Sequence, residues 1–309
     1  MFKETSREIR LTNRLFLVLI IAAVFSPFAL SGLFAQGGIY ENAGVNQATI
    51  VSELLYFIIA AVFIAVGGRQ IFESVPLGGI RSGSIFWIVV LSICVQPVML
   101  WLNMITMSFA RNHVAEAAAR ASGSFFINLL YLAVLPALIE EFVFRGLIYQ
   151  GLRGLGVWKA AVLSALMFAL LHLNINQFAY AFVLGIILSL CVEITGSLYS
   201  SMILHFLINS RSVALLSSED MVNSMLTQSS TQPVITAGEY LAGAAVYTPV
   251  VILCIAGIWW SLKRLARSCG REDLFDMTAD ENGKEKIATP ALLAGIILAV
   301  FYIIRYDLL

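Results

Sequence analysis

The sequence predicts an all-α, polytopic membrane protein built as a bundle of eight or nine transmembrane helices. Of its 309 residues, 60% are hydrophobic and only 12% are charged, whereas a soluble domain has about 45–50% apolar and about 25% charged residues. The mean hydropathy is +0.88. Apolar runs of the length needed to cross a hydrocarbon core, about 20 residues, recur along the whole chain.

This composition excludes several classes of protein. A soluble enzyme needs a polar surface, which so apolar a chain cannot supply. The 19 basic and 19 acidic residues cancel, so no net field attracts nucleic acid. We therefore expect the lipid bilayer as the surrounding medium and no nucleic-acid partner. The chain is expected to form one integral-membrane domain over residues 1–309.

Nine segments are candidate spans, and the short breaks in the middle of the chain also allow a count of eight. The two segments 157–173 and 197–216 are short or polar enough to pack inside the bundle instead of facing lipid. The other seven candidates are 15–35, 50–67, 85–107, 124–150, 175–193, 240–262 and 291–306.

The distribution of lysine and arginine predicts the orientation of these spans. With nine spans, fourteen of these residues fall on the side of the N-terminus and four on the other side, Arg145 being set aside because it lies within a span. Cytoplasmic loops carry the excess of positive charge. We therefore predict a cytoplasmic N-terminus.

Ionisable side chains within spans are costly and tend to persist where they pair or perform a function. In this sequence they concentrate in the region 124–216, in the short stretches EEFVFRG, FALLH and HFLIN. Together with one amide side chain they form a candidate site of six residues: Glu140, Glu141, Arg145, His172, His205 and Asn209.

Helical spacing predicts how these side chains are directed. Glu141 and Arg145 are four residues apart with the acid first, which favours an ion pair along one helix face. Glu140 is turned by about 100° from Glu141 and points elsewhere. His205 and Asn209 also share a face, since they too are four residues apart.

Depth in the membrane brings Glu140 and His172 together. Glu140 precedes the basic residue Arg153 by 13 positions, and His172 follows Lys159 by 13 positions. At 1.5 Å per residue, both lie about 20 Å from the same side of the membrane. Two antiparallel neighbouring helices would therefore hold these two side chains side by side.

Two kinds of chemistry fit such a set. A carboxylate and an imidazole around one water can remove its proton for attack on a carbonyl group, while imidazole and amide N–H groups stabilise the resulting oxyanion. This reading requires no cofactor. Alternatively, Glu140, His172 and His205 could hold a Zn²⁺ ion with an open fourth position. The sequence does not separate the two readings, because both need the same three side chains to converge.

The three stretches resemble, in order and spacing, the EExxxR, FxxxH and HxxxN motifs of the CPBP family. This family comprises type II CAAX prenyl endopeptidase-like intramembrane proteases and is also called the Abi family. The resemblance implies that residues 124–216 form the catalytic core helices. It also implies a prenylated CAAX protein or another membrane-anchored peptide as substrate.

The resemblance further implies a role for each motif residue. Glu140 and His172 match the pair that activates water, and His205 and Asn209 match the pair that stabilises the oxyanion. Glu141 and Arg145 match the accompanying acid and arginine, which support the site. The competing readings are a non-catalytic membrane scaffold or bacteriocin-immunity protein and, in a third class, an ion or proton translocator.

Three further residues have structural interpretations. Phe168 lies one turn before His172 and is expected to pack beneath its ring. Glu53 lies near the outer start of its span, where we expect it to reach the membrane interface. His113 belongs to the polar, alanine-rich stretch 108–123, which we expect to form an interfacial helix or a short exposed one.

Overall fold

The computed structural model describes residues 2–35, 45–110, 124–216, 235–275 and 287–308. Over these residues the fold is entirely helical and contains no strand, which confirms the predicted fold class. The expected interfacial helix and His113 lie mainly outside the described residues, since 111–123 are not among them.

Seven helical segments of the described chain are long and apolar enough to cross a membrane. Of the two segments expected to be short or polar, Val157–Leu171 (α9) is too short to qualify and Leu198–Leu216 (α11) is not among the seven. The seven are Ser6–Ser26, Thr49–Glu73, Ser82–Met107, Phe125–Leu155, Ile175–Thr195, Ala237–Cys269 and Pro290–Asp307.

These spans are formed by helices whose bounds are close to the expected ones, with longer ends. The first helix, for example, begins at Phe2 instead of 15, because no proline or glycine interrupts the polar residues before the apolar run. The helices are α1 Phe2–Ala35, α2 Val45–Phe63 continuing to α3 Arg69–Glu73, α4 Ser82–Met107, α10 Ile175–Thr195, α13 Ala237–Cys269 and α14 Pro290–Ile303.

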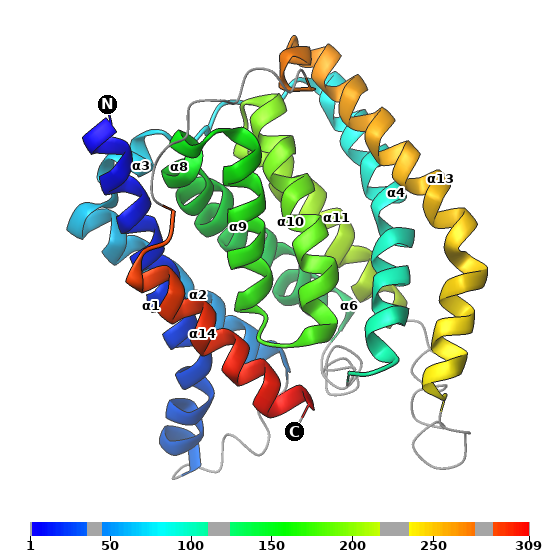
Figure 1. The fold of residues 1–309 in the computed structure, drawn as a ribbon, viewed down its shortest axis with the longest axis horizontal. Coiled ribbons are helices and arrows are strands. Elements are labelled where there is room, and N and C mark those ends of the chain that lie inside the picture. The colour runs from blue at the N-terminus through cyan, green and yellow to red at the C-terminus, as the bar shows by residue number, and fades with distance from the viewer. Residues whose placement is uncertain (1, 36–44, 111–123, 217–234, 276–286, 309) are drawn as a thin grey trace.

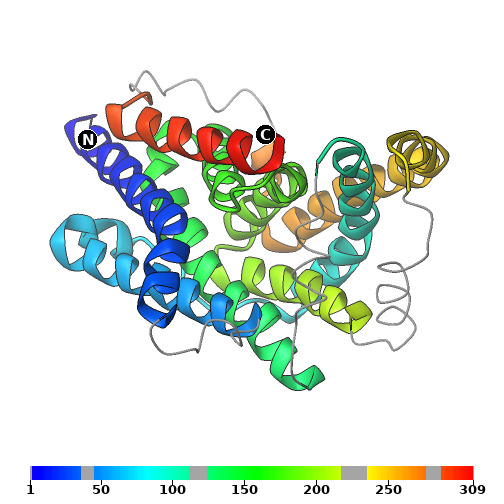
Figure 2. The ribbon, with the colours of Figure 1, turned by 90° about the horizontal axis from the view of Figure 1, so that it is seen from below.

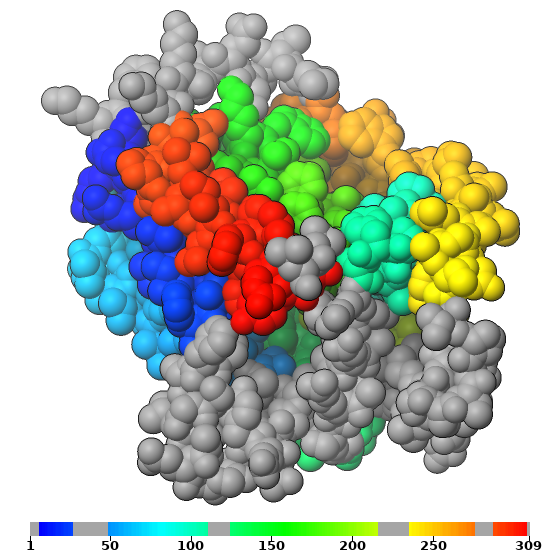
Figure 3. Space-filling view, turned by 60° about the horizontal axis from the view of Figure 1, so that its bottom comes forward, coloured from blue at the N-terminus to red at the C-terminus, as the bar shows by residue number. Residues whose placement is uncertain are grey.

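The helices are arranged as a centre with two flanks (Figures 1 and 2). One flank consists of α1, α2 and α14, and the other of α4 and α13, while α9, α10 and α11 lie between them. The space-filling view shows α14 against α1 and α4 against α13 (Figure 3). Asn13 joins α1 to the start of α14 by donating to the Ile287 carbonyl at 3.1 Å and the Thr289 hydroxyl at 3.0 Å.

A buried carboxylate holds together one end of the bundle. The N-terminus, α3, α8 (Tyr149–Leu152) and the C-terminal end of α13 lie at one end, and the C-terminus lies at the other (Figure 1). At the first end Glu193 accepts hydrogen bonds from Arg153, from Arg271 at 2.8 Å and from the Tyr149 hydroxyl at 2.9 Å. This buried carboxylate therefore ties together the ends of three helical segments.

The helix that carries the EEFVFRG stretch is continuous but not uniform. It runs from Phe125 to Leu155 and contains two π-helical stretches, Leu130–Val134 and Phe142–Ile148. The second stretch begins directly after Glu141, where α7 (Leu135–Glu141) ends. Such stretches are rare and frequently occur at functional sites.

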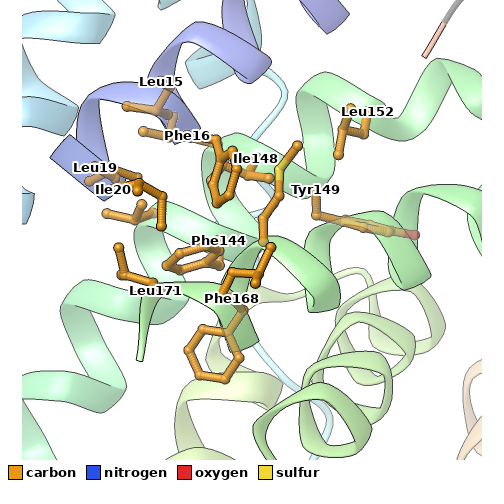
Figure 4. Close-up of a cluster of buried hydrophobic side chains, with 14 of the residues drawn as sticks. Leu15, Phe16, Leu19, Ile20, Phe144, Ile148, Tyr149, Leu152, Phe168 and Leu171 are labelled. Atoms are coloured by element: carbon orange, nitrogen blue, oxygen red, sulfur yellow. The ribbon is translucent and has the colours of Figure 1, made fainter. Parts of the chain in front are cut away.

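A buried apolar cluster fixes this helix in the bundle. Phe16 and Ile20 of α1 pack with Phe144 and Ile148 of the motif helix and with Leu171 at the end of α9 (Figure 4). All five side chains are at least nine-tenths buried. Polar side chains of the same helix are thereby held at fixed positions on its other faces.

Gly185 lets α10 approach α9 closely. A Cβ atom at this position would lie 2.8 Å from the Cβ and 2.9 Å from the Cα of Ala165 on α9. It would also lie 3.2 Å from Nη2 of Arg145. The close packing of these two helices therefore requires glycine here.

We expect Gly185→Ala to lower the thermal stability of the detergent-solubilised protein. Inserting a methyl group into a packed core costs roughly 1–3 kcal/mol, and here the nearest atoms include backbone, which cannot rotate away. The matched control is Gly83→Ala in α4, where an added Cβ meets nothing within 4 Å. A thermal unfolding scan should show a lower midpoint for the first variant only. Equal midpoints for both would contradict the packing argument.

Candidate active site

A buried carboxylate at Glu141 links two motifs. Its Oε1 atom accepts a hydrogen bond from Nη1 of Arg145 at 2.8 Å and another from Nδ1 of His205 at 2.9 Å. Glu141 and Arg145 are completely buried and His205 is nearly so. The ion pair predicted from the four-residue spacing is confirmed, and the contact with His205 brings α11 to the same place.

Arg145 connects the remaining helices to this pair. Its Nη2 atom donates to the carbonyl oxygen of Gly185 on α10 at 3.2 Å. The guanidinium carbon also lies 4.4 Å from the centre of the Phe168 ring on α9, within the range of a cation–π interaction. One arginine side chain therefore contacts α9 and α10 as well as its own helix.

Phe168 contacts both candidate histidines. Its ring meets the His172 ring edge to face at 4.9 Å between centroids, which confirms the predicted packing. The His205 ring lies 6.0 Å away, also nearly perpendicular. Phe144 completes the aromatic group at 5.1 Å. One aromatic ring therefore contacts both imidazoles.

His172 ends α9 and its ring is oriented by the backbone. The carbonyl oxygen of Phe168 accepts a hydrogen bond from Nδ1 of His172 at 2.9 Å. Since a carbonyl can only accept, the proton of the neutral ring is on Nδ1, and Nε2 has its lone pair available. Leu173, the next residue, turns the chain with a positive φ of 53°.

The turn after His172 is held from two sides. Asn174 caps α10 by accepting a hydrogen bond from the Gln177 backbone at 2.8 Å, and it donates to the His172 carbonyl at 2.8 Å. Asp307, beyond the end of α14, accepts from the backbone N–H of Ile175 at 2.6 Å. A carboxylate is favourable at a helix N-terminus. The position of His172 at the end of α9 thus depends also on the segment that follows α14.

Glu140 lies beside His205 instead of in direct contact with His172. Its Oε2 atom is 3.8 Å from Nε2 of His205, and 14% of its side chain is exposed. In the described part of the chain, no hydrogen bond or ion pair joins Glu140 to His172. Asn209 lies one turn beyond His205 on α11 and is half-buried. Direct contacts therefore join four of the six candidate residues, Phe168 joins His172 to them, and Asn209 is adjacent.

Glu53 was expected at the membrane interface, and that expectation was wrong. The residue is 3% exposed on α2, which packs against α7. Its carboxyl group lies close to that of Glu140 on the motif helix. Sequence reasoning missed it because a single acid near a helix end resembles an interfacial residue. The one available signal was its occurrence within an apolar run.

The side chains do not form a metal site in this conformation. No group of three or more histidine, cysteine, aspartate or glutamate side chains among the described residues is placed to hold a metal ion. We therefore derive no step through Zn²⁺ bound by Glu140, His172 and His205.

Comparison with known proteins gives one match. Residues 122–211 match the family described as type II CAAX prenyl endopeptidase Rce1-like. No curated protein and no solved structure matches the chain. The matched segment contains all three motifs, so the resemblance read from them is confirmed over this segment. The family is one of membrane proteases, and the seven apolar helices agree with an integral membrane protein.

We expect Arg145→Met to destabilise the protein strongly. Breaking a buried ion pair on one side costs about 3–5 kcal/mol, because the remaining charge is left buried without its partner. The measurement is the shift of the thermal unfolding midpoint in detergent.

Arg69→Met is the matched control. Arg69 and Glu73 are also four residues apart, and Nε of Arg69 lies 2.9 Å from Oε1 of Glu73, but both side chains are exposed. An exposed pair of this spacing contributes about 0.3–0.5 kcal/mol. Equal shifts of the unfolding midpoint for the two variants would contradict the argument that burial makes the Glu141–Arg145 pair more stabilising than the exposed pair.

Proposed function

We propose that this protein is an intramembrane endopeptidase that hydrolyses a peptide bond with an activated water. The observation that carries the proposal is the convergence of three separate motifs on one polar cluster within an apolar bundle. Glu141 contacts Arg145 of its own stretch and His205 of another, and Phe168 of the third stretch lies against both Arg145 and His205. The match of residues 122–211 to a protease family supports the same function.

The proposed reaction begins with the water. The Nε2 lone pair of His172 and the carboxylate of Glu140 accept hydrogen bonds from it, and Glu140 removes a proton as the water oxygen attacks the carbonyl carbon. The carbonyl becomes a tetrahedral oxyanion. The same proton then passes to the leaving amine nitrogen as the carbon–nitrogen bond breaks, which restores the Glu140 carboxylate.

The oxyanion is stabilised from α11 in this proposal. His205 donates Nδ1–H to Glu141, so its Nε2 is the atom that faces the site, and as an imidazolium it would donate Nε2–H to the oxyanion. The amide of Asn209 supplies the second donor. Preorganised donors of this kind contribute about 10²–10³-fold each to the rate. Glu141 and Arg145 support the site by fixing the His205 ring.

The proposed substrate is a peptide anchored to the membrane, such as the C-terminus of a prenylated CAAX protein. A site lined by helices in a bilayer is reached most readily by a chain that is itself held at the lipid surface. We also propose that the N-terminus is cytoplasmic, because cytoplasmic ends carry the excess of positive charge. Arg69 of α3, Arg153 directly after α8 and Arg267 near the end of α13 belong to the segments that lie at the same end of the bundle as the N-terminus (Figure 1).

We expect Glu140→Ala and His172→Ala, made separately, to lower the rate of cleavage of a farnesylated CAAX peptide in detergent. Loss of a general base typically costs about 10²–10⁴-fold. Thermal unfolding of each variant establishes that it is folded. Glu73→Ala is the control, because Glu73 is exposed on α3, outside the polar cluster.

Undiminished cleavage by folded Glu140→Ala and His172→Ala would overturn the assignment of these residues. Absence of cleavage by the wild type, together with unfolding of Glu140→Ala, would favour a membrane scaffold or immunity protein. Proton flux in proteoliposomes that both substitutions abolish would favour a translocator. Inhibition of an active preparation by a zinc chelator would favour metal chemistry.

A further inference from the structure

The flank formed by α4 and α13 carries a group of aromatic and basic side chains near the C-terminal end of α13. Trp259 and Trp260 are 48% and 49% exposed. The amine of Lys263 lies 4.9 Å from the centre of the Trp259 ring, and the guanidinium carbon of Arg264 lies 5.5 Å from the centre of the Trp260 ring. Both distances are within the range of a cation–π interaction. From α4, Trp87 meets Trp260 edge to face at 5.0 Å between centroids. We call these five residues the α4–α13 cluster.

The two cations of the cluster differ from their neighbour on the same helix in having no acidic partner. Arg267, one turn beyond Lys263, pairs with Glu272 at 2.9 Å. In the described part of the chain, no carboxylate forms an ion pair with Lys263 or Arg264, and both residues are exposed. Among the described residues, the cluster therefore carries two uncompensated positive charges.

The place of the cluster along α13 corresponds to the edge of the hydrocarbon layer. Residues 240–262 include no charged residue, and their exposed side chains, such as Val246 and Leu253, are apolar. The two tryptophans lie near the end of this stretch, and the two cations follow within one turn. Tryptophan is enriched at membrane–water interfaces, and lysine and arginine gather beyond them on one side. The cluster is therefore at the level of the lipid headgroups.

The exposed face of α1 changes from apolar to basic in the same direction. Val18 and Ile21 are exposed apolar residues, and Arg14 and Arg10, one and two turns before Val18, are exposed basic residues. The N-terminus and the C-terminal end of α13 lie at the same end of the bundle (Figure 1). Both flanks therefore place the headgroups of one leaflet at this end.

We propose that the α4–α13 cluster binds the headgroup of an anionic phospholipid in the leaflet on the side of the N-terminus. Lys263 and Arg264 supply the charge that pairs with the phosphate. The indole N–H groups are donors that lipid oxygens accept, and the rings provide an apolar surface for the adjoining acyl chains. An anionic headgroup matches two uncompensated cations, whereas a zwitterionic headgroup brings a cation of its own. The inference does not depend on the protease function.

The test compares an anionic and a zwitterionic lipid around the full chain in nanodiscs. Brominated phosphatidylglycerol and brominated phosphatidylcholine quench tryptophan fluorescence when they bind next to an indole ring. Three of the five tryptophans belong to the cluster, so quenching reports mainly on it. We expect phosphatidylglycerol to bind about 5- to 30-fold more tightly than phosphatidylcholine, the factor corresponding to one or two basic residues near an anionic membrane surface.

Three variants separate the charge of the cluster from its packing. Lys263→Gln combined with Arg264→Gln removes both charges, and we expect the preference for phosphatidylglycerol to disappear. Lys263→Arg combined with Arg264→Lys keeps two cations beside the rings, so the preference should persist within about twofold. Arg69→Gln is the matched control, because Arg69 is exposed at the same end of the bundle but is paired with Glu73. Its preference should equal that of the wild type.

The outcomes are distinct. Equal quenching of the wild type by the two lipids would overturn the proposal, and so would an unchanged preference in the doubly neutral variant. An equal loss in Arg69→Gln would also overturn it, because the lipid would then respond to the total charge at this end of the bundle. Thermal unfolding establishes that each variant is folded. If the doubly neutral variant does not fold, Lys263→Gln alone replaces it, with an expected loss of about fivefold.

Discussion

The arrangement of the central helices depends on one buried charge, the carboxylate of Glu141. An ionised group in an apolar interior is tolerated only when paired and hydrogen-bonded, and Glu141 is paired by Arg145 within its helix and by His205 from α11. Arg145 in turn contacts Gly185 on α10 and the Phe168 ring on α9. Four helical segments are therefore held around a single carboxylate, which fixes the positions of Arg145 and His205.

Much of the fold follows from the sequence because the bilayer imposes simple requirements. A span must be helical and about 20 residues long, so the runs of apolar residues predict the helices closely, including which two are unsuited to spanning alone. The pair of Glu141 and Arg145 was also predictable, since contacts four residues apart depend only on helix geometry. Side chains that meet across helices are different, and the sequence carries no comparable signal for them.

The position of Glu140 illustrates this limit. Counting residues from the basic helix ends predicts its depth, and hence a place at the level of His172, but says nothing about the direction in which it points around the helix axis. In the structure it faces His205 and Glu53. Glu53 lies on α2 and Glu140 on α7, with α3 and α4 between them in the chain. Contacts between such distant segments arise only when the bundle packs. The contacts of Phe168 with Phe144, Arg145 and His205, which lie on other helices, were unpredictable for the same reason.

The hydrogen bond from Ile175 to Asp307 has a consequence for how the protein is made. Asp307 follows the last motif residue, Asn209, by nearly one hundred positions. The helix N-terminus next to His172 therefore lacks this acceptor until α14 has been synthesised and has inserted beside α1. During biogenesis the earlier helices can be in the membrane while this turn is still incomplete. A nascent chain that carries all three motifs would thus not yet contain the finished site.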